Sequence, residues 1–182
     1  MSESQLQQYE RASGWALDQV RTAASHLDAP TPCGDWQVRD LLNHFVETQE
    51  FWAGSARGDD VSPPSGDPPP LIGDDPVTAY GEVRTEVLRS FGEDGAIERT
   101  GPLLGIAVAD NLLHGWDLAR AAGVDAAMPD GLAAAAYDHI HGRFTDDQRT
   151  GVFGPEIAVN ESASAQERLL AYTGRDASWS AG

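Results

Sequence analysis

The sequence predicts an all-α fold, a four-helix bundle with short C-terminal additions. Three observations support this prediction. Apolar residues recur three and four positions apart over several long stretches, proline and glycine gather mostly between those stretches, and no series of alternating apolar and polar residues indicates a sheet. A chain of 182 residues can bury one substantial core, so we expect residues 1–182 to form a single domain.

The first two predicted helices span residues 4–27 and 36–57, and each has apolar residues along one face. Prolines and a glycine separate the two stretches, and Asp35 is a suitable N-cap for the second helix. His44 falls on the apolar side of that helix. Its imidazole should therefore point at the core or at the edge of the core.

Residues 58–76 are rich in proline, glycine and aspartate, so no regular element is expected there. We predict a long exposed loop, which could also act as a lid. Asp75 and Pro76 have the N-cap and first-turn pattern of a third helix, 77–91. The later helical stretches are 102–123, 130–144 and 165–174, and residues 153–160 are irregular or a short strand.

The stretch 102–123 carries polar groups where a core should be. Asp110, His114 and Asp117 fall on one stripe of this predicted helix, at about 100° per residue. Apolar residues cover most of the remaining circumference, which is typical of a buried helix. A buried carboxylate is costly unless it is paired, so these residues should meet a cation, a hydrogen-bond donor or a metal.

Composition narrows the class of protein. The formal charge is −17, from 29 acidic residues against 12 arginines and no lysine, and such a chain repels a phosphate backbone, so no nucleic-acid partner is expected. Cys33 is the only cysteine, which excludes an internal disulfide and a multi-cysteine zinc site. No apolar stretch is long enough to span a membrane, and the N-terminus resembles no signal peptide, so a cytoplasmic protein without a membrane partner is expected.

A metal site is one interpretation of the polar stripe. Asp110 and His114 are four residues apart on one helix and can meet one ion, while His44 on a facing helix could supply a third ligand. Two imidazoles and a carboxylate suit zinc, iron or nickel, with positions left open for water or substrate. The alternative is structural: His44 is then an ordinary half-buried histidine, and Asp110 and His114 form a hydrogen-bonded pair.

Four further residues have two readings each. Asp117 could accept the ring N–H of His114 and so orient that imidazole toward a metal, or it could pair with Arg120 three residues on. Arg39 and Arg120 could bind a carboxylate on a thiol or substrate, or they could form surface ion pairs. Cys33 could be a redox thiol or, more commonly, a packed loop residue.

Three stretches carry a resemblance to a known family. PTPCGDWQVRDLLNHFV, ADNLLHGWDLARAAG, and FGPEIAVN followed by ERLLAYTGRD are similar to actinobacterial proteins related to mycothiol-dependent maleylpyruvate isomerase, within the DinB/YfiT-like superfamily. The resemblance implies a four-helix bundle that holds a divalent metal, zinc first and nickel second, through three side chains. At the matching positions these are His44, Asp110 and His114.

Two departures from the isomerase shape the expected function. The isomerase has Glu where this chain has Asp110, and it carries a further C-terminal domain that this chain is too short to contain. The resemblance therefore implies a metal-dependent thiol S-transferase-like protein, using mycothiol or a similar low-molecular-weight thiol against an electrophilic substrate. The alternatives are a non-catalytic metal- or small-molecule-binding bundle and a metal-dependent hydrolase. We expect a monomer or a homodimer.

Overall fold

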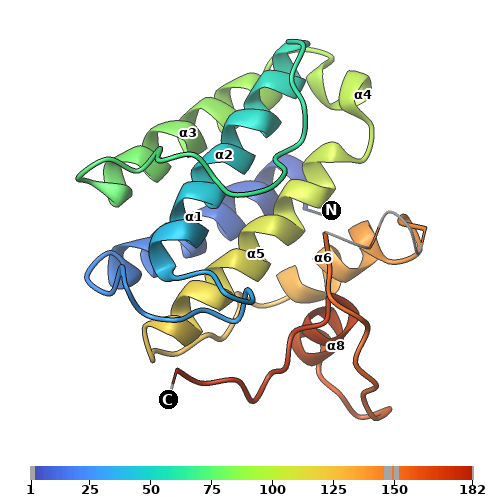
Figure 1. Cartoon of the computed structure of the whole chain (residues 1–182). Coiled ribbons are helices and arrows are strands. Elements are labelled where there is room, and N and C mark those ends of the chain that lie inside the picture. Colours follow the sequence, from blue (N-terminus) through green and yellow to red (C-terminus); the bar gives the residue numbers. More distant parts are fainter. Residues whose placement is uncertain (1–2, 146–148, 150–151, 182) are drawn as a thin grey trace.

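The computed structural model describes residues 3–145, 149 and 152–181, and this part of the chain contains helices and no β-strand. Four long helices form a bundle, as predicted (Figure 1). They are α1 (Gln5–Ala23), α2 (Val38–Arg57), α3 (Pro76–Phe91) and α5 (Leu103–Ala121). Three shorter helices complete the described fold: α4 (Ala96–Thr100), α6 (Leu132–Ile140) and α8 (Ala165–Tyr172). The all-α prediction is confirmed.

Local capping chemistry fixes where several of these helices begin. Ser4 opens α1 in a capping box with Gln7, and Asp75 caps α3, whose first residue is a proline. Ser164 and Glu167 form a capping box at the start of α8. These caps satisfy backbone N–H groups that have no partner within the helix.

The prediction that Asp35 caps the second helix is wrong. An isolated antiparallel bridge joins Pro30 to Gln37, and the backbone N–H of Thr31 donates to the carbonyl of Trp36 at 3.1 Å. This pairing holds residue 35 in the turn, so Gln37 is the N-cap, and its backbone N–H donates to Asp40 at 3.0 Å. The turn places Cys33 and Trp36 beside α2.

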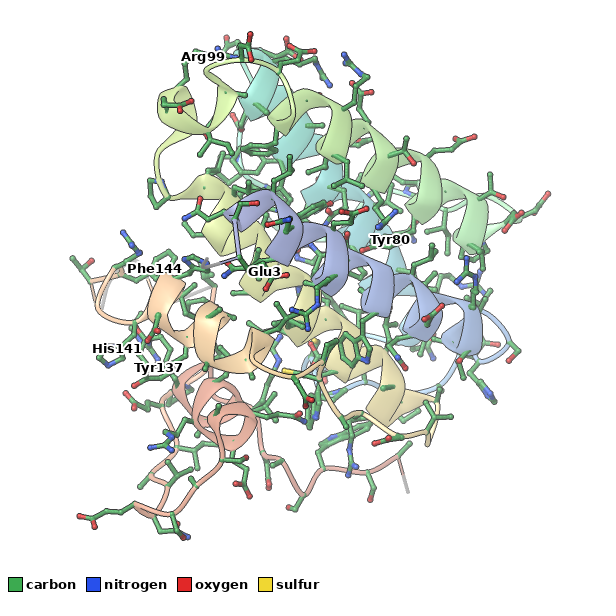
Figure 2. The ribbon with its side chains drawn as sticks, turned by 180° about the vertical axis from the view of Figure 1, so that it is seen from behind. Glu3, Tyr80, Arg99, Tyr137, His141 and Phe144 are labelled. Carbon is green, nitrogen blue, oxygen red and sulfur yellow. The ribbon has the colours of Figure 1, made fainter. Side chains whose placement is uncertain are left out.

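One later helix boundary and one short helix also differ from the sequence prediction. The predicted helix 130–144 ends early as α6 at Ile140, because His141 is extended and Gly142 has a φ of 68°. The aromatic rings of Tyr137 and His141 stack there, 4.7 Å apart, at the edge of the molecule (Figure 2). Helix α4 was not predicted, because five residues between Gly95 and Gly101 are too few to show a helical period.

Helix α5 is the centre of the bundle, with α1 packed along it and α2 packed along α3. Gly115 lets α1 and α5 approach closely, since a Cβ there would lie 2.5 Å from Cζ3 of Trp15. Asp117 is fully buried, and the side chains of Asp110 and His114 are 14% and 13% exposed. The polar stripe therefore lies inside the bundle, as predicted.

The chain after α5 packs back against that helix in two places. Helices α6 and α8 pack against each other, and α6 packs against α5. The segment after α8 then runs back across the end of α5 (Figure 1). Two arginines attach it: Arg175 pairs with Asp117, and Arg120 donates to the backbone carbonyl of Trp179.

Residues 58–75 form no helix or strand, and most of their side chains are exposed. The end of this loop is attached to α2, because the Asn43 side-chain oxygen accepts hydrogen bonds from the backbone of Leu71 and Ile72, at 2.7 and 3.0 Å. Ile72 is only 5% exposed. Within the described chain, none of the helices has both the length and the apolar character that crossing a membrane requires.

Candidate metal centre

The structure places His114 next to each of the other two residues for which the sequence suggested a metal, Asp110 and His44. His44 comes from α2, and Asp110 and His114 come from successive turns of α5. Nε2 of His114 lies 3.4 Å from Oδ1 of Asp110, and the two imidazole rings are perpendicular with centroids 5.2 Å apart. Two helices that pack in one bundle thus place two imidazoles and a carboxylate side by side, and we call these three residues the histidine–aspartate cluster.

Two polar residues of α2 hold the other oxygen of Asp110. Oδ2 accepts hydrogen bonds from the Thr48 hydroxyl at 3.2 Å and from the Gln49 side-chain amide at 3.4 Å. The Tyr9 hydroxyl in turn donates to the Gln49 side-chain oxygen at 2.6 Å. Thr48, Gln49 and Tyr9 are all buried, so this network fixes the carboxylate with Oδ1 toward His114.

Asp117 lies on the opposite side of the His114 ring. Its Oδ2 is 3.3 Å from Nδ1 of His114 and 3.1 Å from the Cys33 sulfur, whose S–H donates to it. Arg175 binds both oxygens of Asp117, through Nε at 2.9 Å to Oδ1 and a terminal nitrogen at 2.8 Å to Oδ2. The ion pair of Asp117 is thus with Arg175 and not with Arg120.

Burial and charge set the protonation states in this centre. Burial, helped by the charge of His114, lowers the pKa of His44 to about 4, so this imidazole is neutral at pH 7. Burial alone would also lower the pKa of His114, but the charge and hydrogen bond of Asp110 outweigh burial and raise that pKa well above its usual value. The pKa values of Asp110 and Asp117 are lowered, because their cationic neighbours outweigh burial.

Two groups of ligand atoms therefore share His114. On the Asp110 side, Nε2 faces the histidine–aspartate cluster. On the Cys33 side, Nδ1 faces Cys33 and Asp117, and among the described residues these three form the group whose ligand atoms all lie within 4.8 Å of one another. A thiolate, an imidazole and a carboxylate can hold a divalent ion, so either side has the donor chemistry of a metal site.

A surface pocket of about 470 Å³ lies beside the centre. Its lining residues are Cys33, Asp35, Trp36, Asp40, Asp67 and Pro68. Two of them contact the centre directly: Cys33 donates to Asp117, and the Trp36 ring lies 4.9 Å from that of His44. The turn before α2 and the loop after it thus form an opening of the size that a small molecule needs.

The two arginines proposed to bind a carboxylate lie outside this centre. Arg39 pairs with Asp28 at the surface, with exposed fractions of 49% and 83%. Arg120 donates to the Trp179 carbonyl. Neither lines the pocket or contacts the histidine–aspartate cluster.

Sequence reasoning missed three residues that shape the centre. Thr48 and Gln49 are polar residues on the apolar side of α2, which is the same pattern that singled out Asp110, and they could have been found in that way. Arg175 had no such pattern. It follows Gly174 just beyond α8 and is 58 residues away from Asp117 along the chain.

Comparisons with known proteins give a family and two relatives. Residues 10–136 match the family described as mycothiol maleylpyruvate isomerase N-terminal domain. Two uncharacterized proteins of Mycobacterium tuberculosis, from strains CDC 1551 / Oshkosh and ATCC 25618 / H37Rv, are each 27% identical over 169 residues, which is 84% of this chain and 86% of the relative. No solved structure matches the chain.

Proposed function

The chain belongs to the mycothiol maleylpyruvate isomerase N-terminal domain family, as its sequence stretches predicted, and we propose that it is a metal-dependent thiol S-transferase. In this proposal His44, Asp110 and His114 would hold a divalent ion, zinc or nickel, which would favour loss of the proton of a low-molecular-weight thiol of the mycothiol type to solvent. The thiolate sulfur would then form a bond to a carbon of the electrophilic substrate, from which a leaving group departs with its bonding electrons. The observation that supports the proposal best is the balance of buried charge around His114.

That balance fits a divalent ion. Asp110 and Asp117 contribute two negative charges, Arg175 contributes one positive charge, and His44 is neutral. One negative charge remains, which His114 compensates by keeping a proton when no ion is present. A divalent ion in place of that proton would lower the pKa of a bound thiol and would leave one positive charge in the centre, which suits a thiolate.

The surrounding side chains prepare the ligand atoms. Asp117 is an ionised acceptor, so it keeps a proton on Nδ1 of His114, and the lone pair of the neutral imidazole is then on Nε2. Thr48 and Gln49 donate to Oδ2 of Asp110, so Oδ1 faces the same side as Nε2 of His114. The ligand atoms are therefore oriented before an ion arrives, which lowers the entropic cost of binding it.

The pocket beside the centre gives a small thiol a place to bind. Trp36 offers an apolar ring next to His44, whereas Asp35, Asp40 and Asp67 offer carboxylates to hydroxyl or amide donors. A thiol with many hydroxyl groups suits such a wall better than a thiol with several carboxylates, because like charges repel. This chemistry is compatible with a thiol of the mycothiol type.

The test is metal content and thiol transfer in the wild type and in Asp110→Asn. We would measure zinc and nickel in tag-free protein, and then conjugation of mycothiol, with N-acetylcysteine in parallel, to a chlorodinitrobenzene electrophile. The amide is a weaker ligand without charge, so we expect a folded variant whose transfer rate falls by at least about 100-fold. Asp18→Asn is the matched control, because Asp18 is 67% exposed and forms its ion pair with the nearby Arg21 on α1.

The outcomes separate the proposal from its alternatives. A wild type that takes up no zinc or nickel, or an Asp110→Asn variant as active as the wild type, would refute it. Metal binding without transfer to any electrophile would favour a non-catalytic bundle. Metal-dependent hydrolysis of an ester that needs no thiol would favour a hydrolase.

A further inference from the structure

A neutral His114 imidazole can bind an ion through Nε2 or through Nδ1 but not through both, because one of the two nitrogens carries the proton. Nε2 faces Asp110 at 3.4 Å, and Nδ1 faces Asp117 at 3.3 Å with Cys33 beside it. The two sides therefore compete for the same imidazole. The inference that follows rests on the proposed function, because the two sides compete only if His114 is a metal ligand.

By donor chemistry alone the Cys33 side would attract zinc at least as well. Its ligand atoms already lie within 4.8 Å of one another, and zinc binds a thiolate readily. Some feature of the fold must therefore keep an ion on the Asp110 side if that side is the functional one.

Arg175 is that feature. Its guanidinium donates hydrogen bonds to Oδ1 and Oδ2 of Asp117, and the same Oδ2 also accepts a hydrogen bond from the S–H of Cys33. Asp117 is fully buried and the Arg175 side chain is 12% exposed, so the pair is shielded from water. An ion on the Cys33 side would have to displace a two-point charged contact and leave a buried guanidinium without its partner, which is costly.

We propose that Arg175 is a positioning residue that reserves His114 for an ion on the Asp110 side, by holding Asp117 and Cys33 away from the metal. It contacts neither the ion nor a substrate in this role. It acts on Asp117, which keeps the Nδ1 proton of His114 in place.

The position of Arg175 is fixed by the C-terminal part of the chain, beyond residues 10–136, over which the family model matches. Gly174 has a φ of 79°, and a Cβ there would lie 2.5 Å from the backbone of Gly154. The backbone N–H of Arg175 donates to the Leu170 carbonyl at the end of α8. The segment after α8 therefore brings a residue from outside residues 10–136 into the centre.

Cobalt tests this role, because a cobalt–thiolate bond gives an intense near-ultraviolet absorption band that imidazole and carboxylate ligands do not give. We would load wild type, Arg175→Gln and Arg175→Lys with Co²⁺ alone. The wild type should show no thiolate band. Arg175→Gln should show a strong band that disappears in Arg175→Gln/Cys33→Ser, since the freed Cys33 then becomes a ligand.

Two further variants protect the test against simple misfolding. Arg175→Lys keeps the buried charge, so it should fold even if Arg175→Gln does not. Its single ammonium cannot bind both carboxylate oxygens of Asp117 as the guanidinium does, so a thiolate band weaker than that of Arg175→Gln is expected. Arg120→Gln is the matched control, because it loosens the same C-terminal segment at Trp179 without touching Asp117. It should keep the wild-type spectrum.

The results distinguish this inference from the proposed function. A thiolate band in the wild type, its absence from every folded Arg175 variant that binds Co²⁺, or an equal band in Arg120→Gln would overturn the role of Arg175. A wild type that binds no Co²⁺ would refute the proposed ligands, yet a thiolate band gained in the Arg175 variants would still uphold the role of Arg175. If neither the wild type nor the variants bind Co²⁺, both are wrong.

Discussion

The Asp117–Arg175 pair should be strongly coupled in the free energy of unfolding. Asp117→Asn leaves the guanidinium of Arg175 without a charged partner, and Arg175→Gln leaves the Asp117 carboxylate without one. Breaking a buried pair from one side costs about 3–5 kcal/mol, because the remaining charge stays in a poorly solvated place.

The exposure of each partner sets the expected magnitude. Asp117 is 0% exposed, whereas the Arg175 side chain is 12% exposed and can recover part of its hydration. We therefore expect about 3 kcal/mol for Asp117→Asn and slightly more for Arg175→Gln. For a chain of this length each kcal/mol lowers Tm by about 2–4 °C, so either single variant should melt about 6–12 °C below the wild type. The double variant should cost about 2 kcal/mol less than the sum of the two single costs.

The assay is urea unfolding followed by circular dichroism, on protein treated with a chelator so that bound metal does not add to the stability. The control double-mutant cycle uses Asp28→Asn and Arg39→Gln, because both side chains of this ion pair are exposed. Its coupling should stay below about 0.5 kcal/mol. If the costs at Asp117 and Arg175 simply add to within about 0.5 kcal/mol, the pair is not coupled and the reasoning about buried charge is refuted.

Three further predictions concern the rest of the fold. Gly115→Ala should destabilise the protein by about 1–3 kcal/mol in urea unfolding, since its Cβ would lie 2.5 Å from the Trp15 ring. Gly81→Ala is the control, because the space around its Cβ is open, and it should be neutral or stabilising. Equal effects of the two substitutions would contradict the close packing of α1 against α5. Arg89 and Arg57 lower the pKa of Glu86 to about 2, so the stability that Glu86 adds is present above its unfolded pKa and is lost as the pH falls toward 2. Because the Glu86 side chain is 39% exposed, the difference in unfolding free energy between wild type and Glu86→Gln should be under about 1 kcal/mol at pH 7 and should vanish near pH 2. A difference that grows on acidification would contradict this. Limited proteolysis with proteinase K should cut first within residues 58–70, as judged by mass spectrometry of the fragments, and first cuts inside α5 would contradict the bundle.

The local period of the sequence was enough to place the helices and the polar stripe of α5. Asp110, His114 and Asp117 follow one another at three- and four-residue steps, so any α-helix over this stretch puts them on one face. The apolar residues around them predicted that the face is buried. His44 could be assigned to the core side of α2 by the same argument, which made it a candidate third ligand beside Asp110 and His114, and the family resemblance implied the same three residues.

Only the tertiary structure decided which partners those residues have. The sequence left Asp117 between His114 and Arg120, both one turn away, whereas its ion pair is with Arg175 and its thiol contact is with Cys33, respectively 58 and 84 residues distant along the chain. A helical period describes neighbours three or four positions apart and contains no information on such distant contacts. They depend on where the turn before α2 and the segment after α8 pack against α5, because the final position of each side chain is set by the packing of the whole chain.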